Sequence, residues 1–235
     1  MDSTSNAQVE RYYFEQFRND FPLPAGEIIY TDKPDVIIRG PTRLGIEITN
    51  LYIRPGADPT SEQVQRRRRE QALHLAQSLY QAHGGKRFEL SVDFHPGKPI
   101  LDYKLLARAI CELAQRLIAA PTGQVSPSRF ADIDMLRFVY LNATEYADAQ
   151  WRVVQSFTVP SLSVERLREV VVEKSKKLAA YQPCDQYWLL AVIDLMDVAQ
   201  DQHVDWPAGE ILGNSPFERV LLYKPQCRQV LEVPQ

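Results

Sequence analysis

The residues best suited to chemistry are two carboxylates, Asp35 and Glu47, which lie on neighbouring apolar stretches of the sequence. Residues 36–39 and 44–49 are each expected to form a short strand, because a Gly-Pro turn separates them. Neighbouring strands lie about 4.8 Å apart and alternate their side chains between faces, so a hairpin would bring the two carboxylates together. With the Ile48 backbone carbonyl they would make a site for a hard divalent cation such as Mg²⁺. The alternative is that both acids are simply solvated.

The order Pro34-Asp35, a hairpin turn and then Glu47-Ile48-Thr49 resembles the PD-(D/E)xK nuclease motif, with Thr49 in place of the final lysine. The resemblance covers the hairpin and its flanking helices. It implies an α/β (α+β) fold in which helices flank a central mixed sheet, with a restriction-endonuclease-like αβββαβ core carrying a long insertion. It further implies a nuclease that cleaves DNA or RNA, DNA being favoured, with Mg²⁺ or Mn²⁺ held by Asp35, Glu47 and Ile48.

The first helix is expected over residues 7–19, where apolar residues recur at helical spacing. In nucleases of the resembled class, a first helix often carries an extra glutamate that faces the metal. Glu10 and Glu15 are both candidates, and we favour Glu10. A glutamate on the exposed flank of the helix is the alternative for either one.

A lysine that replaces the one missing at Thr49 is expected from the helix over residues 163–181. Lys174 lies three residues after Val171 and four before Leu178, inside the apolar arc of that helix. A lysine on the apolar face of a helix is unusual unless its ammonium extends to solvent or serves a site below the helix. We therefore consider both a catalytic Lys174 and a lysine stabilised only by the helix dipole.

Four consecutive arginines, Arg66, Arg67, Arg68 and Arg69, lie in a helix expected over residues 61–83. They span more than one turn, so they cannot all face the core. Because guanidinium groups match phosphate oxygens, the run predicts a ridge that contacts the nucleic-acid backbone. A solvated helix face with acidic partners is the alternative.

The composition is that of a folded protein, with 235 residues, 45% hydrophobic and 24% charged residues and a net charge of −3. We expect a single nuclease-like domain over residues 1–235, with residues 61–160 a possible insertion. The negative net charge argues against a protein coated in basic residues, so any nucleic-acid surface must be local. Three distant cysteines indicate neither a disulfide framework nor a zinc site.

The polar N-terminus and the lack of a long apolar run predict a cytoplasmic protein with no membrane association. No phosphate-binding loop, dinucleotide fingerprint, HExxH or GxSxG motif occurs. The leading hypothesis is a metal-dependent nuclease in which Lys174 prepares the attacking water and Glu10 assists. The alternatives are a non-catalytic module on the same fold that binds nucleic acid or protein, and an interaction protein with no nucleic-acid role.

Overall fold

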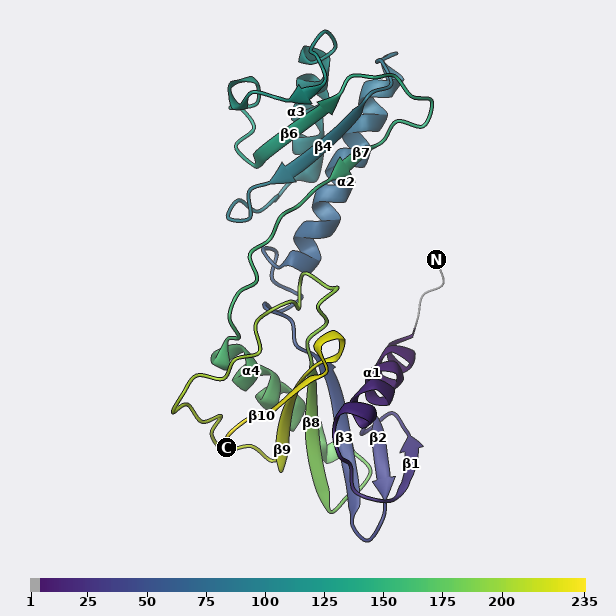
Figure 1. The fold of residues 1–235 in the computed structure, drawn as a ribbon, viewed down its shortest axis with the longest axis vertical. Helices are drawn as coiled ribbons and strands as arrows, with labels where there is room; N and C mark the ends of the chain where they lie inside the picture. The colour runs from purple at the N-terminus through teal and green to yellow at the C-terminus, as the bar shows by residue number, and fades with distance from the viewer. Residues whose placement is uncertain (1–4) are drawn as a thin grey trace. The chain divides into compact units, whose positions relative to one another are not determined.

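The computed structural model describes residues 5–235, and it divides the chain into two compact units (Figure 1). The first unit comprises residues 5–54 and Val159–Gln235, and the second comprises Pro55–Thr158. Along the chain, the second unit therefore interrupts the first. Its range is close to residues 61–160, which the sequence offered as a possible insertion. No helix within residues 5–235 combines the length and apolar character needed to cross a membrane.

The first unit is built on a six-stranded mixed sheet in the order β1-β2-β3-β8-β9-β10. Strands β1, β2 and β3 form an antiparallel meander, whereas β3, β8 and β9 are parallel to one another and β10 is antiparallel to β9. The strands are β1 (Glu27–Tyr30), β2 (Val36–Arg39), β3 (Arg43–Asn50), β8 (Gln186–Val192), β9 (Arg219–Lys224) and β10 (Gln229–Glu232).

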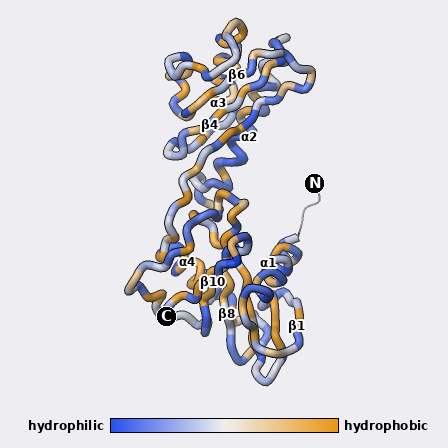
Figure 2. Tube along the Cα trace, viewed as in Figure 1, coloured by the Kyte–Doolittle hydropathy of each residue, from blue (hydrophilic) through white to orange (hydrophobic). Residues whose placement is uncertain are grey.

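Two helices cover opposite faces of this sheet, as its alternating sequence requires. Helix α1 (Asn6–Asp20) contributes Phe14 and Phe17 to a core shared with Ile46 and Ile48 of β3. Helix α4 (Val164–Ser175) packs its own apolar residues against alternate residues of β8 and β9 on the other face. Figure 2 shows the apolar residues of these strands in orange. Glu47 and Thr49, which alternate with Ile46 and Ile48 along β3, are therefore on the α4 side.

Helix α4 is shorter than the helix expected over residues 163–181, and this expectation was wrong at its end. Ser163 begins the helix by accepting a hydrogen bond from the Arg166 N–H, and the helix ends at Ser175. The chain then tightens into i→i+3 bonds and forms the 3₁₀ turn η2 (Leu178–Ala180), a common way for a helix to end. Lys174 consequently lies in the last turn of α4.

The second unit is a four-stranded sheet in the order β5-β6-β4-β7 with two helices. Its core combines residues of both helices with residues of all the strands except β5. The elements are α2 (Glu62–Ala82), β4 (Glu89–Phe94), α3 (Tyr103–Arg116), β5 (Gly123–Gln124), β6 (Leu136–Asn142) and β7 (Trp151–Val153), with the 3₁₀ turn η1 (Pro127–Arg129). This unit thus has a hydrophobic core of its own.

The expected ridge of four arginines on α2 is wrong for Arg69. The side chain of Arg69 is only 5% exposed and forms an ion pair with Glu62. Arg68 donates to the Ile100 carbonyl at 2.5 Å, and Arg66 pairs with Glu70 at 3.3 Å. Successive residues on a helix point in different directions, so a run of four must place one member toward the core. Arg66 and Arg67 are exposed, and phosphate contact by these two residues stays a prediction.

We expect Arg69→Ala to lower the free energy of unfolding by about 3 kcal/mol, because it leaves Glu62 without its charged partner in a largely buried place. The exposed neighbour supplies the control, and Arg67→Ala should change stability by less than about 0.5 kcal/mol. Urea titrations of both variants measure the difference. Equal stability of the two variants would contradict the structural role of Arg69.

Candidate active site

The hairpin of β2 and β3 brings Asp35 and Glu47 to neighbouring positions on one side of the sheet. Val36 is paired with Ile46 in the antiparallel ladder, and Asp35 and Glu47 occupy the next position along it. The Ile48 N–H donates a hydrogen bond to Asp35 Oδ2 at 2.6 Å. The two carboxylates predicted from the sequence are therefore adjacent.

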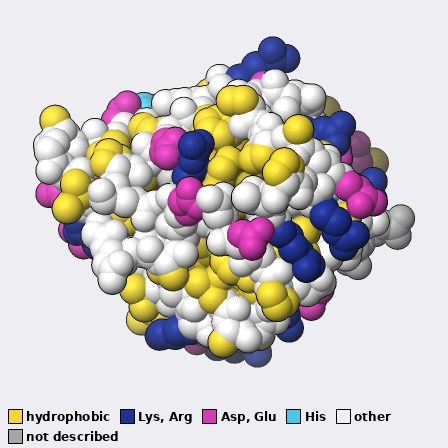
Figure 3. All heavy atoms as spheres, turned by 90° about the horizontal axis from the view of Figure 1, so that it is seen from below, with side chains coloured by type: hydrophobic (Ala, Val, Ile, Leu, Met, Phe, Trp, Pro, Cys, Tyr) yellow, Lys and Arg dark blue, Asp and Glu magenta, His cyan; other side chains and the backbone are white. Residues whose placement is uncertain are grey.

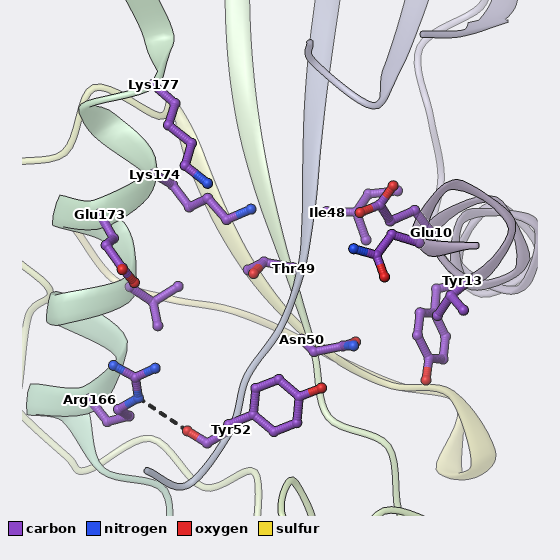
Figure 4. Close-up of a pocket in the computed structure, with 13 residues that line it drawn as sticks. Glu10, Tyr13, Ile48, Thr49, Asn50, Tyr52, Arg166, Glu173, Lys174 and Lys177 are labelled. Carbon is purple, nitrogen blue, oxygen red and sulfur yellow. Dashed lines mark hydrogen bonds between the residues drawn. The ribbon is translucent and has the colours of Figure 1, made fainter. Parts of the chain in front are cut away.

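Lys174 reaches the same place from α4. Its Nζ lies 2.7 Å from Glu47 Oε1, and the two side chains are 17% and 8% exposed. The Lys174 ammonium therefore points inward to Glu47 instead of extending to solvent. Figure 4 shows the amine extending from α4 toward β3, on the side where Thr49 lies. The predicted positions of the carboxylates and the lysine thus meet, whereas their chemical roles stay predictions.

Glu10, rather than Glu15, faces this group of residues. Glu10 lines the same pocket as Lys174 and is half-buried, and burial raises its pKa most, with Lys174 lowering and Glu47 raising it. Glu15 instead accepts from the Tyr30 hydroxyl and pairs with Arg18. The expected choice between the two glutamates agrees with their positions.

The pocket has a volume of about 370 Å³ and is formed by α1, the end of β3 and α4 (Figure 4). Glu47 and Asp35 lie beneath it, next to the lining residue Ile48. Its polar and charged lining residues are Asn6, Glu10, Tyr13, Thr49, Asn50, Tyr52, Arg166, Glu173, Lys174 and Lys177. All of them belong to the first unit, so the second unit is not needed to form the pocket.

Burial and neighbouring carboxylates together determine the protonation of Asp35. Burial, followed by the nearby Glu47 carboxylate, raises the pKa of Asp35 to about 8, with Glu10 adding to the rise. The Ile48 N–H and Lys174 oppose this rise. At neutral pH Asp35 therefore holds a proton, and Glu47 is neutralised by its ion pair.

These residues fit a divalent cation in chemistry, although they are not preformed around one. Carboxylate oxygens of Asp35 and Glu47 with the Ile48 carbonyl are the hard ligands that Mg²⁺ and Mn²⁺ prefer. A cation would also relieve the repulsion that raises the pKa of Asp35. In the described chain, no group of three or more His, Cys, Asp or Glu side chains is arranged to hold a metal. Metal binding would require Asp35 to lose its proton and Glu47 to release Lys174.

Sequence reasoning did not identify a role for Tyr181, which lies beside the carboxylates. The ring is 7% exposed and packs edge-on against Tyr187, with centroids 5.9 Å apart. Burial and then Glu47 raise the pKa of its hydroxyl, yet this hydroxyl makes no well-aligned hydrogen bond to any residue in 5–235. The sequence placed Tyr181 at the edge of the apolar arc of the helix expected over residues 163–181. It did not show the 3₁₀ turn that directs the ring toward Glu47.

Comparisons with known proteins add no relative, because no protein-family model, curated protein or solved structure matches this chain. The geometry of the first unit therefore carries the functional argument alone.

We expect Asp35→Asn to be more stable than the wild type at alkaline pH. Because the pKa of Asp35 is raised to about 8 by folding, its protonated form favours the folded state, and this contribution declines as pH rises from 4 through 8. Asparagine removes the charge and can still accept from the Ile48 N–H. Melting temperatures measured from pH 6 to 9 should show a growing advantage for the variant.

Asp32→Asn is the matched control, since the Asp32 side chain is 92% exposed. It should follow the wild-type profile. An Asp35→Asn melting temperature that falls below the wild type at pH 9 would contradict the assigned electrostatics.

Proposed function

We propose that this protein is a divalent-metal-dependent nuclease that hydrolyses phosphodiester bonds. The observation that carries the proposal is the contact of Lys174 with Glu47 directly beside Asp35. These are the three side-chain types that the PD-(D/E)xK motif needs, with the lysine supplied by α4 instead of position 49. Within the first unit, the elements follow the order α1-β1-β2-β3-α4-β8. This order supports the proposal, because it is the αβββαβ order of a restriction-endonuclease-like core.

In this proposal Asp35, Glu47 and the Ile48 carbonyl hold one Mg²⁺ or Mn²⁺, with Glu10 as an outer or second ligand. When bound, such a metal would lower the pKa of a bound water and offset charge on the scissile phosphate. Lys174, once released from Glu47, would orient that water through its ammonium; to accept a proton at Nζ, the ammonium would first have to lose one of its own. Thr49 contributes only a hydroxyl to the pocket floor.

Binding of the substrate must rely on local positive charge. Figure 3 shows Lys and Arg side chains interspersed with Asp and Glu on the face that it presents, in keeping with the net charge of −3. Lys177 at the pocket is the proposed phosphate contact of the first unit, and the exposed pair Arg66 and Arg67 is a separate proposed contact of the second unit. DNA is the favoured substrate over RNA, and the proposed setting is the cytoplasm.

A non-catalytic binding module is the second candidate, and one observation favours it. The Lys174 ammonium already neutralises Glu47, so the site is stable without a metal. If this ion pair never opens, the pocket can bind a ligand but cannot prepare water for attack.

We expect the wild type to cleave DNA in Mg²⁺ or Mn²⁺, and Asp35→Asn and Glu47→Gln each to lower the rate at least about 100-fold, because each removes a charged metal ligand. Gel assays with single- and double-stranded DNA and RNA at pH 8.5 measure this. Asp32→Asn and Glu165→Gln are matched controls, since both are exposed carboxylates that do not line the pocket. Nucleic-acid binding without cleavage in either metal would favour the non-catalytic module.

Lys174→Met should separate metal binding from cleavage. Without the competing ammonium, Glu47 is free to ligate, so Mn²⁺ affinity measured by calorimetry should rise by at least about fivefold. Cleavage should nevertheless fall at least about 100-fold, since the group that prepares the water is lost. Lys176→Met is the matched control, because Lys176 is exposed and outside the pocket. Weaker Mn²⁺ binding in Lys174→Met would show that the lysine does not compete with a cation.

A further inference from the structure

The walls of the pocket restrict what can reach the carboxylates beneath it. Glu47 is 6% exposed and pairs with Lys174, which lines the pocket between α1 and α4, so a scissile phosphate bound in this pocket lies near the carboxylates. A volume of about 370 Å³ is at the lower end of the range for small-molecule sites. This space suits one nucleotide unit, whereas both strands of a duplex could not enter together.

The two walls carry different charges. On the α4 wall Arg166 pairs with Glu169 and Lys174 pairs with Glu47, so among the described lining residues Lys177 is the cation left for a phosphate. Glu10 is the charged residue on the α1 wall. Figure 4 shows the amines of Lys174 and Lys177 extending to the same side of α4. Only Glu173 adds negative charge to the α4 wall. A strand would therefore place its phosphates along α4 and its bases toward α1 and the end of β3.

Tyr52 supplies an aromatic surface at the end of the pocket floor. Its ring is half-buried and lies in the pocket between Arg166 and Asn50 (Figure 4). Its backbone is held in place, because Arg166 Nε donates to the Tyr52 carbonyl at 3.2 Å and the Ile53 N–H donates to Ala199. Aromatic rings held in this way stack unpaired bases with little dependence on sequence.

We propose that the pocket binds a single strand of nucleic acid, with Lys177 contacting a phosphate and Tyr52 stacking the neighbouring base. The inference rests on the proposed function for the position of the scissile phosphate. Binding itself needs no metal, because Lys174 already neutralises Glu47 through their ion pair. A binding assay without metal can thus test the pocket separately from cleavage.

The experiment measures fluorescence anisotropy of a labelled 12-nucleotide DNA, its RNA counterpart and the blunt DNA duplex, with wild-type protein in EDTA at pH 7. We expect the better single strand to bind at least about tenfold more tightly than the duplex. Tyr52→Ala should weaken single-strand binding about tenfold, whereas Tyr52→Phe should retain it. Lys177→Ala should weaken binding and lower its salt dependence. The DNA and RNA arms identify the favoured sugar.

Tyr12→Ala is the matched control, since Tyr12 is 58% exposed and does not line the pocket. It should bind like the wild type. Duplex binding as tight as single-strand binding, or a Tyr52→Ala affinity equal to that of Tyr12→Ala, would overturn the inference. Absence of binding to any of the oligonucleotides would overturn the inference as well. Tyr52-dependent single-strand binding without cleavage in Mg²⁺ would contradict only the nuclease.

Discussion

The ion pair between Lys174 and Glu47 is the interaction on which the rest of the site depends. A carboxylate as buried as Glu47 is costly unless a charge and hydrogen bonds compensate it. Lys174 provides that charge at 2.7 Å, and it can do so only because α4 ends directly above β3. Asp35, which has no such cation as a direct partner, responds by holding a proton. Lys174 thus neutralises Glu47, whereas burial and the Glu47 carboxylate raise the pKa of Asp35.

The sheet explains why these groups meet. Crossover through α4 makes β8 parallel to β3, and the pairing of Glu47 with Leu189 fixes the position of the acid beneath the helix. Alternation along β3 then assigns Ile46 and Ile48 to the α1 side and Glu47 and Thr49 to the α4 side. A shift of one residue in the register would bury Glu47 against the apolar face of α1 and expose its neighbours. The site and the core are therefore specified by the same pattern.

Much of this arrangement could be predicted from local sequence patterns. The hairpin followed from two apolar runs around a Gly-Pro turn, and Lys174 stood out because it interrupts an apolar arc. Other features depend on how an element packs and not on its own pattern. Arg69 and Glu62 belong to the same helix, but Arg69 is buried because that face of α2 turns toward the core of the second unit. The turn that brings Tyr181 to Glu47 forms only where α4 ends. Periodicity describes one element at a time, so it could not place either residue.

The most direct test of the site is anomalous diffraction from a crystal soaked in Mn²⁺ at pH 8.5, where the proton on Asp35 no longer dominates. The account predicts a manganese peak within bonding distance of carboxylate oxygens of both Asp35 and Glu47, with the Lys174 amine displaced from Glu47. A site without manganese in millimolar Mn²⁺, with Lys174 still bonded to Glu47, would contradict it.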